Sequence, residues 1–236
     1  MKDLISCIMP TTAARKRFLP LAIDNFLQQD YAEKELIILD DSGDPFLNAL
    51  VPDLPGVRYI RYPFKFMTLG QKRNHACSLA SGTIIQHWDD DDYYAPGWLG
   101  SQWEALNTEA AQICGLRKLY FFNPLLKKAW AYTYGLNRQA WVAGATMAYY
   151  KAFWARRPFR PLNVGEDNHF VWSAGVKVAV NHHTHSFVSM LHGGNTSPKH
   201  ITDSQWQPVE AVSVAAILGN KREAYFNATM CPSSDV

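Results

Sequence analysis

The chain has 236 residues, of which 47% are hydrophobic, and a formal net charge of +2. The length suits one α/β domain with a C-terminal extension. So small a net charge excludes a broad attraction to nucleic acid, although Arg156, Arg157 and Arg160 leave a nucleic-acid acceptor open. No apolar run is long enough to cross a membrane, and residues 4–9 lack signal-peptide features, so a cytoplasmic protein is expected.

The N-terminal half alternates between short apolar runs and segments of helical period. Apolar runs bounded by turn residues are typical of parallel strands buried on both faces, and apolar residues three or four apart indicate amphipathic helices. Strands are predicted at residues 4–9, 35–39, 57–62 and 84–88, and helices at residues 18–29 and 69–79. The pattern predicts parallel strands joined by helices.

Aspartates follow two of these strands, with Asp40 and Asp41 after the second and residues 89–92 after the fourth. Ligands gather at the carboxyl ends of parallel strands, so both groups are candidates for a binding site. Four adjacent carboxylates repel one another and are costly to desolvate, which favours Mn²⁺ or Mg²⁺ among them. The alternatives are a turn cap for the pair and a water-facing acidic turn for the run.

Basic residues open the helix predicted at residues 69–79. Lys72 and Arg73 lie in its first turn, where the helix dipole disfavours cations. We therefore expect a phosphate or a carboxylate nearby, the alternative being an ordinary pair of surface cations.

Together these segments resemble family 2 glycosyltransferases. Residues 5–44, ISCIMPTTAARKRFLPLAIDNFLQQDYAEKELIILDDSGD, resemble the family's strand, Pro-Thr turn, helix and Asp-ended strand. Residues 69–99, LGQKRNHACSLASGTIIQHWDDDDYYAPGWL, resemble its basic helix and Asp-x-Asp motif. The likeness is close over about residues 4–106 and weaker at residues 164–170, VGEDNHF, and 190–197, MLHGGNTS.

The resemblance implies a GT-A fold, which is a mainly parallel sheet with helices on both faces. It further implies a glycosyltransferase domain at residues 1–200, with a nucleotide-sugar-binding half at residues 1–106 and an acceptor half at residues 107–200. A helical extension is expected at residues 201–236, with an apolar helix at residues 209–218 that covers the acceptor side or pairs with a second subunit in a homodimer.

The resemblance also implies where the donor binds. Asp41 accepts hydrogen bonds from the base, beside the Pro-Thr turn, although Thr12 stands where the family usually has an aromatic residue. The residues expected to bind the nucleotide sugar are Pro10, Thr11, Thr12, Asp40, Asp41, Lys72, Arg73, Asp89 and Asp90. Asp89 and Asp91 face the same way along an extended segment, and with His192 they are the expected metal ligands. The alternative for His192 is an ordinary polar loop residue.

For catalysis, the resemblance implies that Asp167 is the general base and that Glu166 belongs to the same motif. Asp167 takes the proton of the acceptor hydroxyl while its oxygen attacks the anomeric carbon, with inversion there. The alternative is that both carboxylates merely favour a helix N-terminus.

The second half predicts strands at residues 118–122, 128–132 and 141–147. Four aromatic residues in this region, Trp130, Tyr132, Tyr134 and Trp141, are expected either to stack on sugar faces or to belong to the core. His183 and His185 have a spacing that zinc can use, but no third and fourth ligand is evident, so a zinc site is not expected.

The predicted function is metal-dependent, inverting transfer of a sugar from a nucleoside diphosphate sugar, with a UDP-sugar favoured. The acceptor is a hydroxyl of a saccharide, a lipid-linked sugar or another small molecule. A lipid-linked acceptor is compatible with peripheral association of the protein with a membrane. Two alternatives stay open. One is nucleotidyl transfer, which also uses paired aspartates and divalent ions, and the other is a non-catalytic module that binds nucleotide sugars or glycans.

Overall fold

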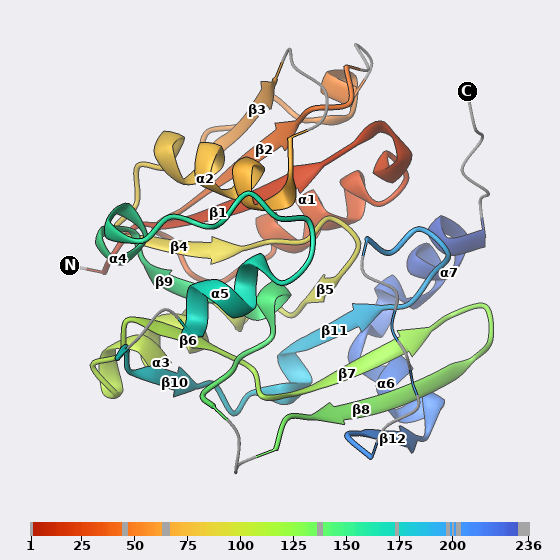
Figure 1. Cartoon of the computed structure of the whole chain (residues 1–236). Helices are drawn as coiled ribbons and strands as arrows, with labels where there is room; N and C mark the ends of the chain where they lie inside the picture. Colours follow the sequence, from red (N-terminus) through yellow and green to blue (C-terminus); the bar gives the residue numbers. More distant parts are fainter. Residues whose placement is uncertain are drawn as a thin grey trace.

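The computed structural model describes residues 2–43, 47–62, 67–135, 139–172, 175–196, 199, 201 and 204–230. Within these ranges the chain forms one sheet of seven strands and one of five, which lie next to each other (Figure 1). No helix in the described ranges is long and apolar enough to span a membrane.

The seven-stranded sheet contains every strand predicted in the N-terminal half. Its spatial order is β10 (Val178–Val180), β6 (Ile113–Gly115), β9 (Ala148–Tyr150), β4 (Ile84–His87), β1 (Ile5–Thr11), β2 (Lys34–Asp40) and β3 (Val57–Arg61). β9 is antiparallel to both of its neighbours and the other pairs are parallel. The carboxyl ends of β1, β2 and β4 therefore meet at one edge of the sheet.

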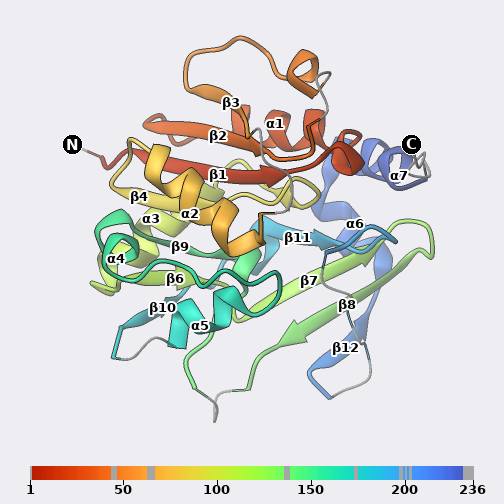
Figure 2. The same ribbon diagram turned by 45° about the horizontal axis from the view of Figure 1, so that its top comes forward.

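Both faces of this sheet are covered because its strands are apolar on both sides. In β1 the fully buried Cys7 and Ile8 belong to different core clusters, one on each face. One face packs against α1 (Leu19–Leu27) and α3 (Trp98–Thr108), and the other against α2 (Leu69–Leu79), α4 (Lys151–Arg156) and α5 (Glu166–Trp172). Figure 2 shows α2, α4 and α5 on the near side of the sheet. The predicted GT-A architecture is thus confirmed.

The five-stranded sheet is mainly antiparallel. Its order is β12 (Trp206–Val209), β8 (Lys128–Thr133), β7 (Lys118–Asn123), β11 (Phe187–Met190) and β5 (Tyr93–Tyr94), and only the pair β7 and β11 is parallel among these described strands. Helices α6 (Ala211–Ile217) and α7 (Arg222–Met230) pack against it. Short 3-10 turns complete the described chain at Ala13–Arg15 (η1), Leu47–Leu50 (η2), Gly144–Thr146 (η3), Thr184–Ser186 (η4) and Gly219–Lys221 (η5).

The aspartate run bridges the two sheets, because β4 ends just before it and β5 begins just after it. β11 lies beside β5 in the second sheet and ends at Met190, two residues before His192. This connection brings the late histidine segment, about a hundred residues further along the chain, next to the aspartates.

One predicted strand is wrong. Residues 141–147 form a turn that contains η3, and the strand β9 begins only at Ala148. The Thr146 hydroxyl donates to the carbonyl of Ala143 at 2.7 Å and accepts from the Leu116 amide at 2.9 Å, so a side chain holds the turn. The described part of residues 201–236 adds β12 to the second sheet besides its two helices. Ser197, at the end of the expected histidine segment, lies outside the described residues.

Candidate active site

A cavity of about 610 Å³ opens between the strand ends of the first sheet and the face of the second. The predicted site residues on its wall are Pro10, Thr11, Thr12, Lys72, Arg73, Asp89, Asp90, Asp91, Glu166 and Asp167. Segments that are far apart in the sequence therefore surround one space. Asp40, Asp41 and His192 are not part of the wall, although Asp41 and His192 each contact a residue that is.

The four consecutive aspartates have different surroundings. Asp90 accepts a hydrogen bond from the Thr11 hydroxyl at 2.7 Å, and Asp92 accepts one from the Met190 amide at 2.9 Å. Burial, and after it the charge of Asp91, raises the pKa of Asp90 to about 7 and that of Asp92 well above its ordinary value. Asp90 and Asp92 thus fix the run to β1 and β11, whereas the Asp89 side chain is 34% exposed toward the cavity.

Asp91 lies at the centre of a charged cluster. Its Oδ2 atom is 2.9 Å from His192 Nε2 and 3.2 Å from Asn195 Nδ2, and it forms an ion pair with Arg15. Burial alone would raise the pKa of Asp91, but the hydrogen bond from His192 and the charge of Arg15 lower it to about 2. The His192 ring stacks on Phe18, with a centroid distance of 4.7 Å, which fixes its orientation. Asp91 and His192, which the sequence analysis named as metal ligands, are therefore in direct contact.

The two basic residues of α2 each meet a carboxylate, as the helix dipole led us to expect. Lys72 Nζ lies 2.5 Å from Asp41 Oδ1. Arg73 forms a buried ion pair with Glu166 and is 3.9 Å from Asp89 Oδ1. Burial raises the pKa of Glu166 even though the charge of Arg73 opposes this. Arg73 therefore connects the aspartate run to the start of α5.

Asp40 is fully buried and has three hydrogen bonds inside the protein. Its Oδ1 atom accepts from the amide and the hydroxyl of Ser42, at 2.9 and 2.6 Å, and its Oδ2 atom accepts from the Tyr59 hydroxyl at 2.7 Å. These contacts order the turn after β2 and so place the neighbouring Asp41 beside Lys72.

Asp167 stands at the first turn of α5 on the cavity wall. Its Oδ1 atom accepts from the Asn168 amide at 2.7 Å. Its Oδ2 atom packs so closely on Gly144 of η3 that a Cβ atom at that glycine would be 2.2 Å away. The absence of a side chain at Gly144 therefore lets the carboxylate lie against the turn.

Aromatic side chains of the second half form the far wall of the cavity. Tyr134 stacks on Trp141 with a centroid distance of 4.8 Å, and Tyr132 contacts both Trp141 and Trp206. Trp130, which the sequence grouped with them, does not line the cavity and packs at the edge of the core. In the described ranges, no three His, Cys, Asp or Glu residues form a metal-binding group, and this includes the predicted ligands Asp89, Asp91 and His192.

Arg15 is a charged site residue that the sequence analysis missed. It follows the Pro-Thr turn in η1 and lines the cavity, with a side chain only 12% exposed. In the sequence it is one of three basic residues in a row, with Lys16 and Arg17, and nothing there distinguishes it. Only the path of the chain after β1 shows that it turns toward the aspartates.

A mostly parallel sheet that is covered on both faces and carries carboxylates at its strand ends matches the GT-A fold. The family described as glycosyl transferase family 2 matches residues 6–160. The chain belongs to glycosyl transferase family 2 and is a glycosyltransferase. No curated protein matches it in sequence.

Solved structures with the same fold include Staphylococcus aureus TarS 1–349 in complex with UDP-GlcNAc. It has a TM-score of 0.65 and 16% identity, over 96% of this chain and 73% of that one. The mannosyltransferase PcManGT from Pyrobaculum calidifontis, in complex with GDP-Man and Mn²⁺, has a TM-score of 0.58 and 16% identity. That match covers 78% of this chain and 59% of the mannosyltransferase. At such identities the likeness concerns the fold.

Proposed function

We propose that the protein transfers a sugar from a nucleoside diphosphate sugar to an acceptor hydroxyl. The observation that carries this proposal is the shared cavity, in which the aspartate run, the start of α2 and the start of α5 surround one space. A donor needs a cation beside its diphosphate and a base near its anomeric carbon. Asp91 is proposed for the first requirement and Asp167 for the second.

The residues around Asp91 fit a divalent ion that also binds the donor's phosphates. Two neighbouring ligands of an octahedral ion, each at about 2.1 Å, lie about 3.0 Å apart. Asp91 Oδ2 and His192 Nε2 are 2.9 Å apart and joined by a hydrogen bond, which a shared ion would replace. Mg²⁺ and its analogues commonly take one or two protein carboxylates and complete their shell with phosphate oxygens and water. Asp91 and His192 would hold Mn²⁺ or Mg²⁺, with Asp89 at the open side. The ion would neutralise charge that develops on the leaving diphosphate.

For the donor, we propose that Asp41 and Lys72 meet the base and that the turn at Pro10, Thr11 and Thr12 lies alongside it. A structural neighbour in complex with UDP-GlcNAc supports a UDP-sugar as the first candidate. Another neighbour in complex with GDP-Man makes GDP the second nucleotide to test. Asp90 and Arg73 line the cavity, and their contacts with Thr11 and Glu166 hold them in place there.

For the reaction, we propose that Asp167 accepts the proton of the attacking hydroxyl. Asp167 lies in the first turn of α5 on the cavity wall, and the Asn168 amide donates to one of its oxygens at 2.7 Å. Direct displacement from the face opposite the leaving diphosphate inverts the anomeric carbon. Glu166, buried against Arg73, keeps the start of α5 in place rather than taking the proton.

The aromatic wall suggests that the acceptor has sugar rings. Tyr132, Tyr134 and Trp141 offer faces on which apolar sugar faces can stack. A free saccharide and a lipid-linked sugar share this chemistry. A cytoplasmic location, contact with a membrane surface and a homodimer remain proposals.

The test of the proposed base is Asp167→Asn. The variant should keep its affinity for UDP while its transfer rate falls by roughly 10²- to 10⁴-fold, the usual contribution of a general base. Asp53→Asn, an exposed aspartate away from the cavity, is the matched control and should leave both quantities unchanged. Undiminished transfer by Asp167→Asn would show that the base is another group.

A further inference from the structure

The strongest unexplained feature is the position of Arg15 inside the aspartate cluster. Its Nη1 atom forms an ion pair with Asp91, is 3.2 Å from His192 Nε2 and is 3.8 Å from Asp90 Oδ1. Its Nη2 atom is 3.3 Å from the Thr196 hydroxyl. One nitrogen thus contacts both side chains that are proposed to hold the metal ion.

A guanidinium in this place satisfies the charge of the cluster. Carboxylates buried beside one another need a nearby cation, and Arg15 forms ion pairs with both Asp91 and Asp90. A divalent ion held by Asp91 Oδ2 and His192 Nε2 would compete with Arg15 Nη1, which contacts both atoms. The ion and the guanidinium cannot occupy this position together.

We infer that Arg15 is a resident cation that occupies the metal position until a donor binds. This inference rests on the proposed function. Arg15 would give up Asp91 when a divalent ion and a donor bind together, and its guanidinium would then pair with the diphosphate of the donor in the same cavity. Arg15 therefore opposes binding of the metal alone and favours binding of the metal together with a diphosphate.

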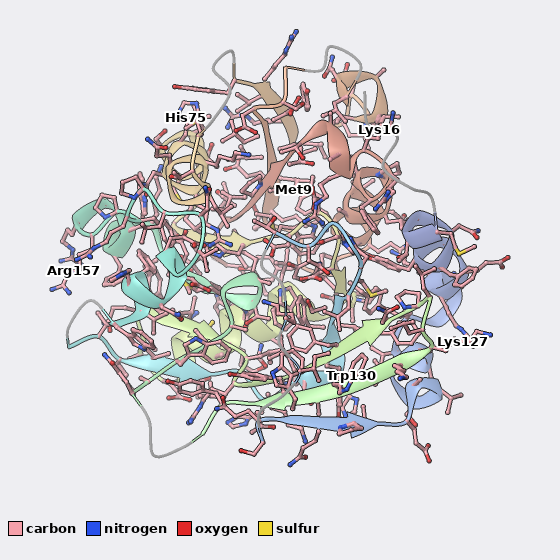
Figure 3. The ribbon with its side chains drawn as sticks, turned by 45° about the vertical axis from the view of Figure 1, so that its right-hand side comes forward. Met9, Lys16, His75, Lys127, Trp130 and Arg157 are labelled. Atoms are coloured by element: carbon pink, nitrogen blue, oxygen red, sulfur yellow. The ribbon has the colours of Figure 1, made fainter. Side chains whose placement is uncertain are left out.

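The geometry around η1 permits such a movement. Arg15 ends a turn of three residues, and its side chain borders the cavity rather than the core. The Thr196 hydroxyl contacts the other terminal nitrogen of the guanidinium, and it is a partner that Arg15 can keep or give up at little cost. The neighbouring Lys16 is exposed and lies on the outside of the same turn, as Figure 3 shows.

The experiment measures binding of Mn²⁺ alone to the full chain, by the loss of the free-ion signal in electron paramagnetic resonance. Arg15→Gln removes the resident cation, and Lys16→Gln removes one positive charge from the next residue without touching the cluster. Arg15→Gln should bind Mn²⁺ roughly tenfold or more tightly than the wild type. Lys16→Gln should match the wild type. Adding Asp91→Asn to Arg15→Gln should abolish the gained affinity.

A second measurement covers the case in which Arg15→Gln is unstable, because it leaves carboxylates without their cation. Its thermal midpoint should rise more with Mn²⁺ than that of the wild type, since the ion replaces the lost charge. In the wild type, saturating UDP should tighten Mn²⁺ binding, and in Arg15→Gln this gain should shrink.

Equal affinity of folded Arg15→Gln and wild type for Mn²⁺ alone would overturn the inference while leaving the proposed transfer intact. If neither protein bound Mn²⁺, with or without UDP, the inference would fall as well. Sugar transfer measured in chelator would then decide the proposed function separately.

Discussion

Gly144→Ala tests whether Asp167 acts through its exact placement in the cavity, because it changes a residue that has no chemistry of its own. The new Cβ atom would lie 2.2 Å from Asp167 Oδ2, whereas ordinary contacts begin at 3.4 Å. The carboxylate oxygen must therefore move by about 1.2 Å. A displacement of about 1 Å in a catalytic group can cost about 10²-fold in rate. We expect the transfer rate to fall by about that factor while UDP affinity is retained.

The assay is steady-state transfer with the donor saturating, beside calorimetric titration with UDP. Gly100→Ala on α3 is the matched control, since the nearest atom to its new Cβ, Asp30 Oδ1, is 4.0 Å away. Gly144 is not among the described residues with positive φ, so alanine suits its backbone. A Gly144→Ala enzyme as fast as Gly100→Ala would refute the placement argued for Asp167.

Two substitutions and one labelling experiment test the buried structure around the site. Asp40→Ala removes a fully buried hydrogen-bond acceptor and should lower the free energy of unfolding by about 1–3 kcal/mol in urea, and an unchanged stability would contradict the structural role. Arg73→Gln leaves Glu166 buried without its partner and should lower the free energy of unfolding by about 3–5 kcal/mol. A decrease of less than about 1 kcal/mol would contradict a buried ion pair. Burial raises the pKa of Cys77 to about 12, so this thiol should resist alkylation in the folded protein at about pH 8, as followed by mass spectrometry, and rapid alkylation would contradict its burial.

Much of the fold could be predicted because its strands are buried on both faces. The central residues of β2 are apolar without a break, and β4 is buried along its whole length, which is typical of an inner strand of a parallel sheet. Helix α2 begins with a capping box at Thr68, and its predicted bounds match the structure. The error at residues 141–147 has a local cause. The Thr146 hydroxyl bonds to the Ala143 carbonyl and stabilises a turn, and the pattern of apolar residues cannot predict such a side-chain hydrogen bond.

The part of the candidate site that lies at the ends of the parallel strands could be predicted from the sequence. The carboxylates after β2 and β4 follow from the position of parallel strands, and the anions beside Lys72 and Arg73 follow from the helix dipole. Arg15 and Gly144 were not predictable, because their importance depends on what approaches them from elsewhere in the chain. Asp91, which contacts Arg15, lies 76 residues further along the chain. Asp167 of α5 contacts Gly144 of η3.

The central claim is that the cavity binds a nucleoside diphosphate through a metal ion at Asp91. Calorimetric titration of the full chain with UDP, first with Mn²⁺ and then with a chelator, tests it most directly when repeated on Asp91→Ala. The account predicts binding that requires both the metal and Asp91. Equal affinity for UDP in the presence of chelator, or in Asp91→Ala with Mn²⁺, would contradict it, and GDP would be titrated in the same way if UDP did not bind at all.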